Sequence, residues 1–450
     1  MLNDGNTTIT QDSPPNNGVE GPPDESIYDN IGRSSKRNAD RVVNSILHKF
    51  GLKNKHSAHV ALDATSDPRT YAEAPKRPDA EEWIDAMQEE LNSLEACGVI
   101  ELVEPPNLKV VSVCRCVFKT KRAPDGQILR YRARLMARGL TQENDVDYHN
   151  TYARVCDITS VRLLFAYAAK AGLLIRQYDI KNAFLNGELH EQIFMEQPPG
   201  QVSEEGKHKV YRLHKAIYGL KQASHQWYQK FSSILGNFGM RQCSNDDCIF
   251  IQQDPLIIVA IYVDDLLVLA KDLKTITVLY GKLKKSFDVH QIDNRVILGF
   301  QYEILTDGSI FLHQESYISR IILHYNMSEA NIIMSPEADD SKHISESKPL
   351  DHKVPIGEAI GKLLYAAMTS RPHIAHAVIR ISQVKQPSQE TWTAIKRIIR
   401  YLKRTNDFGI RYRSGDFDII GYTDANFAGD KTDIKSTTGF IFKFADGPIC

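Results

Sequence analysis

The sequence predicts an α+β fold in which helices and short hairpins alternate. Apolar residues recur at helical spacing after Pro78, and two short alternating stretches flank a tight turn at 123–126. An apolar run at 255–270 surrounds two adjacent aspartates, which is the pattern of a buried hairpin. Helical periodicity returns at 356–404, so both helices and sheets are expected along the chain.

The chain begins with a segment, residues 1–77, that we expect to be a disordered tail or linker. Its first part, to about residue 40, is rich in Pro, Asn, Asp, Gly and Ser and has few large apolar side chains, so it cannot bury enough surface to become ordered. Apolar residues between 42 and 50 share one helical face, which predicts a transient helix, with docking on a partner as the alternative.

The globular body is predicted to begin at residue 78 and to extend to 333. Its first helix has large apolar side chains on one face, and Gly98 supplies a C-cap. These side chains are Trp83, Met87, Leu91 and Leu94. A later helix is predicted between Ser224 as N-cap and Gly239 as C-cap.

Two further segments follow the predicted body. A polar linker at 334–355 separates it from a helical segment at 356–415. Residues 419–425 then have the pattern of a strand within a final segment, 416–450.

Composition limits the class of protein. A hydrophobic content of 42% indicates a globular protein, and 55 basic against 56 acidic residues give no overall charge argument for a nucleic-acid partner. Seven cysteines without a Cys-x-x-Cys pair argue against a disulfide framework or a structural zinc site. The longest apolar run, Leu256 to Val263, is far shorter than the roughly 18 to 20 residues of a membrane span. We expect a soluble intracellular protein without a membrane partner.

Asp264 and Asp265 stand together inside the apolar run. Two ionised carboxylates between apolar strands repel each other and are costly to desolvate, so they need a cation, a hydrogen-bonding turn or exposure at the tip. A solvated Asp-Asp turn is the plain alternative to a metal site.

A third carboxylate, Asp179, occurs in another strand-like stretch. Asn186-Gly187 follows it and predicts a two-residue hairpin turn. Aspartates brought together from distant strands supply the hard oxygen ligands that two magnesium ions share at roughly 3.5 to 4 Å separation. Spacing alone leaves open whether the three meet.

These residues carry a specific resemblance. Tyr262-Val263-Asp264-Asp265 matches the Tyr-x-Asp-Asp box of reverse transcriptases, and residues 177–187 are similar to the copia-type version of their first carboxylate motif. Five further stretches stand in the family's order: 83–102, 130–142, 195–200, 216–223 and 400–403. The chain, over about residues 80–445, resembles the reverse transcriptase region of a copia-type LTR retrotransposon Pol polyprotein.

The resemblance implies a right-hand polymerase with fingers, a mostly antiparallel palm and a helical thumb or connection. Asp179, Asp264 and Asp265 would be the catalytic, metal-binding residues, with Mg²⁺ as two ions and Mn²⁺ as a substitute. The implied partners are an RNA or DNA template with a DNA primer, dNTPs and other parts of the element's polyprotein. The implied location is the cytoplasm, within a virus-like particle, or the nucleus.

Nine basic residues against one acidic residue between Lys109 and Arg138 predict a cationic hairpin surface, with a plain solvated face as the alternative. In the family this hairpin forms the fingers. The resemblance implies that Arg134, then Arg132, clamps the incoming triphosphate. Nucleic-acid contacts are expected from Lys119, Lys121 and Arg122.

Two further nucleotide-binding residues are implied by the motifs. Gln222 matches a position that touches the incoming nucleotide, and Phe184 matches the bulky residue that excludes a 2′-hydroxyl, with an ordinary core Phe as the alternative. Lys396 and Arg400 lie on the basic face of an amphipathic helix, which could track a duplex backbone or simply keep a surface helix soluble.

The final segment is similar to the first strand of the family's ribonuclease H domain, in which Asp424 matches one carboxylate. Most of that domain is expected to be absent, together with its activity. Family patterns differ at several positions: Arg154, Cys156, Ser224, His225 and His373. A decayed or domesticated fragment that binds nucleic acid or protein without catalysis is therefore the alternative to an active polymerase.

Overall fold

The computed structural model describes most of the chain after residue 66. The described residues are 67–106, 112–122, 128–200, 202, 206–338, 354–415, 418–427 and 435–450. They belong to one compact unit, 64–450. The predicted helix at 42–50 and the predicted turn at 123–126 lie outside them. None of the described helices is both long and apolar enough to cross a membrane.

The first helix packs on a two-stranded hairpin. Helix α2 (Ala80–Ala96) buries all four predicted apolar side chains, which confirms this element, and Gly98 follows it with φ +61°. Strands β2 (Cys114–Arg122) and β3 (Ile128–Ala137) pair antiparallel. The Trp83 ring meets the rings of Phe118 and Tyr131 edge-on, at centroid distances of 5.4 and 4.7 Å. These contacts fix one face of the hairpin against the helix.

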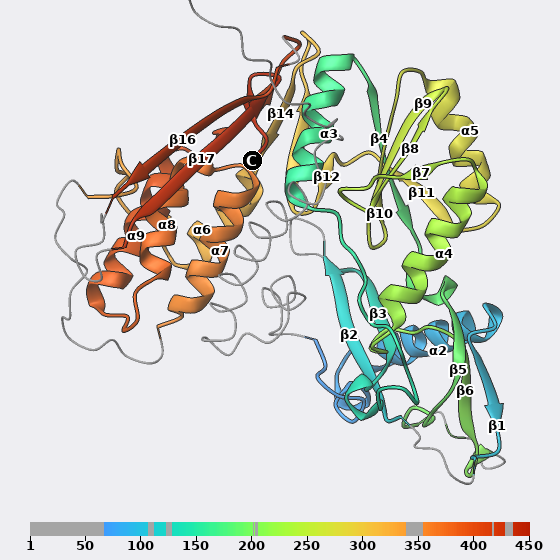
Figure 1. The fold of residues 1–450 in the computed structure, drawn as a ribbon. Coiled ribbons are helices and arrows are strands. Elements are labelled where there is room, and N and C mark those ends of the chain that lie inside the picture. Colours follow the sequence, from blue (N-terminus) through green and yellow to red (C-terminus); the bar gives the residue numbers. More distant parts are fainter. Residues whose placement is uncertain are drawn as a thin grey trace, which may run out of the picture. The chain divides into compact units, whose positions relative to one another are not determined.

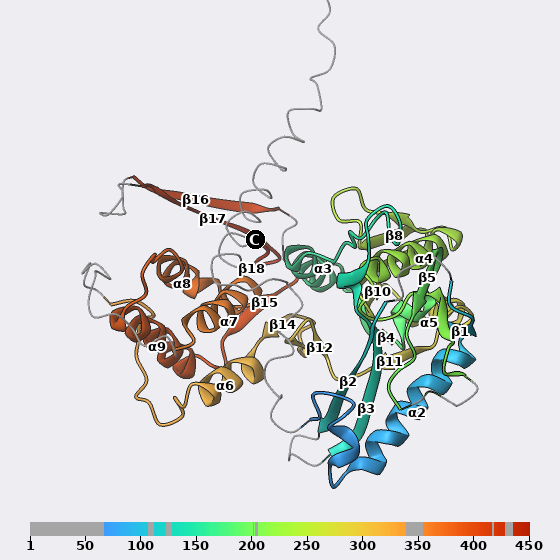
Figure 2. The ribbon, with the colours of Figure 1, turned by 90° about the horizontal axis from the view of Figure 1, so that it is seen from below.

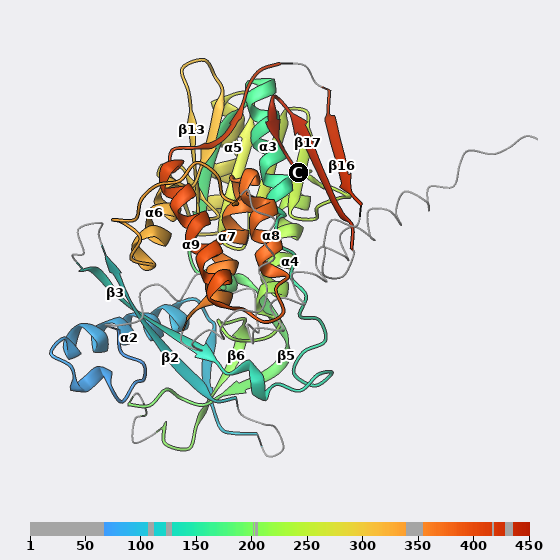
Figure 3. The same cartoon turned by 90° about the vertical axis from the view of Figure 1, so that its left-hand side faces the viewer.

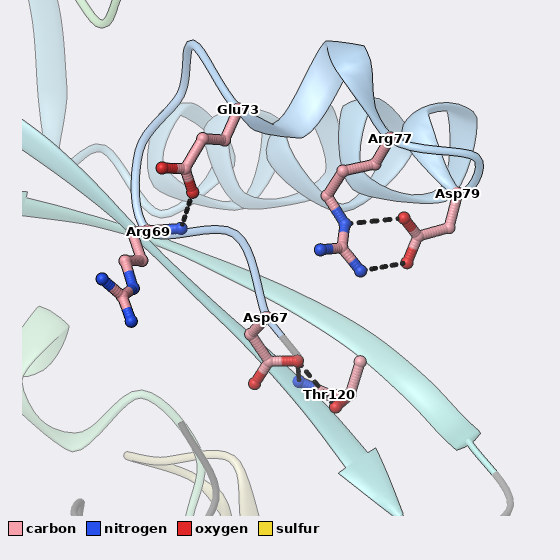
Figure 4. Close-up of polar contacts among 6 residues, drawn as sticks. All are labelled: Asp67, Arg69, Glu73, Arg77, Asp79 and Thr120. Atoms are coloured by element: carbon pink, nitrogen blue, oxygen red, sulfur yellow. Dashed lines mark hydrogen bonds and ion pairs between the residues drawn. The ribbon is translucent and has the colours of Figure 1, made fainter. Parts of the chain in front are cut away.

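The described residues that precede α2 make defined polar contacts. The Asp67 carboxylate accepts hydrogen bonds from the Thr120 backbone N–H and hydroxyl at 3.2 and 2.8 Å (Figure 4). Glu73 accepts from the Arg69 backbone N–H at 2.6 Å, and Arg77 donates to Asp79 at 2.8 Å. These bonds surround the 3₁₀ helix η1 (Ala74–Lys76) and tie the segment to the hairpin.

A six-stranded antiparallel sheet forms the centre of the described chain, in the order β11-β4-β10-β9-β8-β7. Its strands are β4 (Leu174–Ile180), β7 (Arg241–Gln242), β8 (Ile249–Gln253), β9 (Leu256–Tyr262), β10 (Asp265–Ala270) and β11 (Val289–Ile292). Helices α3 (Ile158–Ala171), α4 (Ala223–Asn237) and α5 (Leu273–Lys284) lie beside this sheet in Figures 1 and 2. The β9–β10 hairpin is confirmed, and its strands read as continuous apolar runs because central strands are buried on both faces.

Two local sequence predictions at helix α4 have different outcomes. The predicted N-cap Ser224 is wrong, because α4 begins at Ala223 and Ser224 lies inside its first turn. The preceding residue, Gln222, makes no side-chain cap because its amide is used in contacts with another segment. Gly239 follows the helix with φ +82°, as expected of a residue that terminates a helix.

The predicted hairpin turn at Asn186-Gly187 is wrong. Asn186 ends a 3₁₀ helix, η3 (Ala183–Asn186), and its side-chain amide donates to the carbonyls of Asn182 and Ala183, both at 3.2 Å. The next strand, β5 (Glu188–Met195), leaves the central sheet and joins a separate one in the order β1-β6-β5. The partners are β1 (Ile100–Val103) and β6 (Val210–Lys215).

The C-terminal elements form a helical group and two small sheets. Helices α6 (Glu315–His324), α7 (Ile356–Thr369), α8 (Ala375–Ser382) and α9 (Gln389–Arg404) lie together in Figure 3. They share an apolar core, and the helical segment predicted at 356–404 is confirmed. The sheet β12-β13-β14-β15 comprises β12 (Val296–Ile297), β13 (Phe300–Ile304), β14 (Ile310–His313) and β15 (Gly409–Tyr412). The other consists of β16 (Ile420–Asn426), β17 (Thr437–Phe444) and β18 (Gly447–Pro448), so the predicted strand at 419–425 is confirmed with a shift of one residue.

Candidate active site

The central sheet brings two of the predicted carboxylates together. Asp265 at the start of β10 lies directly opposite Asp179 of β4. Directly opposite residues on antiparallel strands project to the same face, with Cβ atoms about 4.5–5.5 Å apart. Asp179 is also opposite His290 of β11, so the sheet holds its backbone from both sides. Residues separated by more than eighty positions thus become neighbours through strand pairing alone.

Asp264 lies beside this pair in the turn that joins β9 to β10. Tyr262 and Asp265 are paired, so Val263 and Asp264 form a two-residue loop. The Asp264 carbonyl accepts a hydrogen bond from the Ile180 backbone N–H at 2.9 Å, which links the turn to the strand that carries Asp179. All three predicted carboxylates therefore lie at one end of adjacent strands.

The electrostatics of the three groups are coupled. Burial, followed by the charges of Asp264 and Asp179, raises the pKa of Asp265 to about 6, while a hydrogen bond from Gln177 opposes this rise. Burial also raises the pKa of Asp264, Asp179 adds to this rise, and Arg134 and Arg132 lower it. Neighbouring carboxylates repel each other when both are ionised, and a nearby cation stabilises their ionised forms.

The chemistry of this donor set fits divalent cations such as Mg²⁺, which prefer carboxylate oxygens. Among the described residues, however, no three His, Cys, Asp or Glu side chains already surround a common ion position. The carboxylates would therefore have to turn toward a bound ion.

Basic residues of the hairpin β2–β3 alternate along each strand with residues that are buried, and one of them, Arg130, reaches Glu89 of α2. Strand register places Lys119 opposite Arg132 and Lys121 opposite Arg130, while the alternate positions are buried against the helix. Lys119, Lys121 and Arg132 are exposed, and the Arg122 side chain lies outside the described residues. The alternation of a strand thus separates a cationic face from an apolar one.

Arg134 connects this cationic face to the carboxylate site. Its guanidinium lies over the Tyr218 ring at 4.8 Å from the centroid, and its charge lowers the pKa of Asp264. The Tyr218 ring in turn meets the Phe184 ring edge-on at 5.0 Å. Sequence reasoning missed Tyr218, although it lies within the quoted 216–223 stretch.

The backbone around Tyr218 is fixed by close packing. The Tyr218 carbonyl accepts from the Ala137 backbone N–H at 2.9 Å. Gly219 has φ +94°, and a Cβ there would collide with the Ala137 carbonyl oxygen, so both the conformation and the space require glycine. This contact sets the position of Tyr218 relative to the base of the hairpin.

Gln222 is fully buried and its side chain is engaged. Its Nε2 donates to the Asp147 carbonyl at 2.7 Å, and its Oε1 accepts from Gln142 Nε2 at 3.1 Å. Gln142 Oε1 also accepts from the Lys221 backbone N–H at 2.9 Å. Gln222 therefore ties segment 142–147 to the start of α4.

The remaining predicted residues lie on other elements. Lys396 and Arg400 on α9 line a cavity of about 760 Å³, and Arg400 Nε donates to the Asn331 carbonyl. Asp424 lies on β16, whose seven residues are all exposed. None of the described contacts of these three residues reaches the carboxylate site.

Several positions that depart from the family pattern make defined contacts. Arg154 forms an ion pair with Asp247, and the Cys156 thiol donates to Asp246 at 3.7 Å. A ring nitrogen of His225 hydrogen-bonds the Tyr152 carbonyl at 2.8 Å. The fold accommodates these substitutions.

Comparison with known proteins identifies the family of the chain. A family model described as "Reverse transcriptase (RNA-dependent DNA polymerase)" matches residues 98–339, and the chain belongs to this family. The chain is 37% identical over 404 residues to the retrovirus-related Pol polyprotein from transposon TNT 1-94 of Nicotiana tabacum, covering 87% of this chain and 30% of that protein. It is 35% identical over 402 residues to the retrovirus-related Pol polyprotein from transposon RE1 of Arabidopsis thaliana, covering 88% of this chain and 27% of that protein. It is also 28% identical over 279 residues to a transposon Ty5-1 protein of Saccharomyces cerevisiae, and this match covers 60% of this chain and 90% of that protein.

The chain thus spans less than a third of the length of the two plant polyproteins. The predicted relationship to copia-type retrotransposon Pol polyproteins is confirmed.

Proposed function

We propose that this chain is an RNA-directed DNA polymerase that extends a DNA primer with dNTPs. One observation carries the proposal: the pairing of Asp179 with Asp265, with Asp264 in the adjoining turn and Arg134 close enough to lower its pKa. Acidic groups beside a basic group are the arrangement that phosphoryl transfer requires, because positioning and charge stabilisation supply most of its rate.

Asp179, Asp264 and Asp265 would hold two Mg²⁺ ions, or Mn²⁺ as a substitute, with Asp179 and Asp264 as the bridging pair. Bound ions would lower the pKa of the primer 3′-hydroxyl and neutralise charge on the triphosphate and leaving pyrophosphate. The backbone hydrogen bond between Ile180 and Asp264 keeps the two bridging residues in register.

The protein side chains act on the incoming nucleotide by charge and by shape. Arg134 would donate charge-assisted hydrogen bonds to the triphosphate, with Arg132 as a second cation. The Phe184 ring, supported by Tyr218, would fill the space that a ribose 2′-hydroxyl needs. Gln222 would support the nucleotide-binding residues without touching the nucleotide, because both ends of its amide are hydrogen-bonded within the protein.

We further propose a right-hand arrangement of fingers, palm and thumb. The hairpin β2–β3 would form the fingers, the central sheet the palm, and residues 356–415 a thumb or connection after a linker at 334–355. Lys119, Lys121 and Arg122, and more weakly Lys396 and Arg400, would contact template or primer phosphates. Residues 1–77 would connect this body to other parts of a polyprotein, in a cytoplasmic virus-like particle or the nucleus.

Residues 416–450 would be a ribonuclease H-like segment without activity. That chemistry also uses two metals and several carboxylates. Asp424 lies on a strand whose seven residues are all exposed.

Primer extension on an RNA template tests the proposed function. Wild type should extend a DNA primer with Mg²⁺ or Mn²⁺, and Asp264→Asn should abolish extension while duplex binding persists. Asp293→Asn is the matched control, because it removes the same charge from an exposed residue near β11. A folded wild type that binds duplex but extends no primer with either metal would favour the non-catalytic alternative.

A further inference from the structure

The turn that carries Asp264 has an unfavourable backbone conformation at its first residue. Val263 has φ +59°, in the left-handed region. Two-residue hairpin loops with a positive φ at this position favour Gly, Asn or Asp, because a β-branched side chain is crowded there. The turn therefore needs contacts from outside itself to keep this shape.

Two such contacts hold the peptide groups on either side of Asp264. The carbonyl before it belongs to Val263 and accepts from Trp227 Nε1 at 2.7 Å. The carbonyl after it belongs to Asp264 and accepts from the Ile180 backbone N–H at 2.9 Å. Because peptide groups are planar, fixing both of them fixes the backbone dihedrals of Asp264 and the direction of its side chain.

The Trp227 indole is itself held rigidly. It is 2% exposed, and its ring lies 5.5 Å from Phe231 and 5.1 Å from Phe287, centroid to centroid. A Cβ on Gly187 would come within 2.8 Å of the Trp227 backbone nitrogen, so α4 approaches the end of η3 closely. Through α4 the indole is therefore anchored to the segment that follows Asp179.

We propose that Trp227 is a positioning residue of the polymerase, an inference that rests on the proposed function. Its indole N–H holds the strained Val263 peptide, so that the Asp264 carboxylate is directed toward the metal ion that it would hold together with Asp179. The ring also fills the core, and only the hydrogen bond is assigned the positioning role.

Trp227→Phe separates the two roles, because it keeps an aromatic ring and removes the N–H donor. We expect kcat to fall about threefold to tenfold, the range of a single lost hydrogen bond. The Mg²⁺ concentration for half-maximal extension should rise, while KM for dNTP should stay unchanged. Trp83→Phe is the control: this ring is also fully buried, but its Nε1 donates to no backbone carbonyl among the described residues, so kinetics should not change.

Val263→Gly provides a rescue test in the Trp227→Phe background. Glycine adopts the required φ without crowding, so the turn should keep its shape without the indole bond. The double variant should therefore recover most of the lost kcat and Mg²⁺ response. A purely structural role for Trp227 would give no recovery, since glycine restores no packing, and that result would overturn the inference.

Mn²⁺ binding measured by electron paramagnetic resonance separates this inference from the proposed function. If wild type binds Mn²⁺ but extends no primer, the proposed function fails, while weaker Mn²⁺ binding by Trp227→Phe, restored by Val263→Gly, still supports the positioning role. Equal Mn²⁺ affinity in wild type, Trp227→Phe and Trp83→Phe would overturn it, whatever the activity.

Discussion

Asp265→Asn should stabilise the metal-free protein while removing its activity. The folded state raises the pKa of Asp265 to about 6 from an ordinary 3.8, first by burial and then by the charges of Asp264 and Asp179. This difference corresponds to about 3 kcal/mol at 25 °C, because each pKa unit corresponds to about 1.36 kcal/mol. Asparagine has nearly the same shape without the charge.

The stability gained by Asp265→Asn should increase as the pH rises. Between about pH 4 and 6 the folded state binds more protons at Asp265 than the unfolded state does, so wild-type stability falls as pH rises through this window. The advantage of Asp265→Asn should therefore be near zero at pH 4 and reach about 3 kcal/mol above pH 7.

Urea unfolding in EDTA, followed by tryptophan fluorescence at pH 4 to 8, measures this gain. Asp307→Asn is a control of opposite sign, because hydrogen bonds from Ser309 and the charge of Arg411 lower the pKa of Asp307 to about 2. That variant should be less stable than wild type at pH 7, with the loss disappearing as pH falls. A pH-independent gain, or no gain, for Asp265→Asn would refute the account of the buried carboxylates.

Three further predictions concern substrate handling. Phe184→Val should reduce discrimination against ribonucleotides about tenfold or more in single-nucleotide incorporation of dGTP and GTP, and unchanged discrimination would make Phe184 an ordinary core residue. Arg134→Ala should raise KM for dNTP about tenfold to a hundredfold, and an equal effect of Arg130→Ala, whose side chain pairs with Glu89 at 2.6 Å, would contradict a specific clamp. Wild type should not cleave the RNA strand of an RNA–DNA hybrid, and Mg²⁺-dependent cleavage lost in Asp424→Asn would show this to be wrong.

The buried hairpin around Asp264 could be predicted from sequence because its signal is local. Apolar runs on both sides of two acids define strands β9 and β10 without reference to the rest of the chain. The pairing of Asp265 with Asp179 is a tertiary register, and local patterns do not encode which distant strands become neighbours. Family motifs, rather than periodicity, supplied that expectation.

The failures also have physical causes. Asn186-Gly187 has the composition of a hairpin turn, but the close approach of α4 requires glycine there for space, and its φ is an ordinary −75°. The hydrogen bond of the Trp227 indole could not be predicted from sequence, because it depends on where α4 meets the catalytic turn. Such roles arise from packing between elements.

Template-directed incorporation of one nucleotide tests the central claim most directly. Four RNA templates that differ only at the first unpaired base would be annealed to the same DNA primer, and each dNTP would be offered alone with Mg²⁺. Wild type should add the complementary dNTP in every case, and the preferred nucleotide should change with the template base, while Asp264→Asn adds none. Incorporation that ignores the template base, or that persists in Asp264→Asn, would contradict the assignment of an RNA-directed polymerase to these three carboxylates.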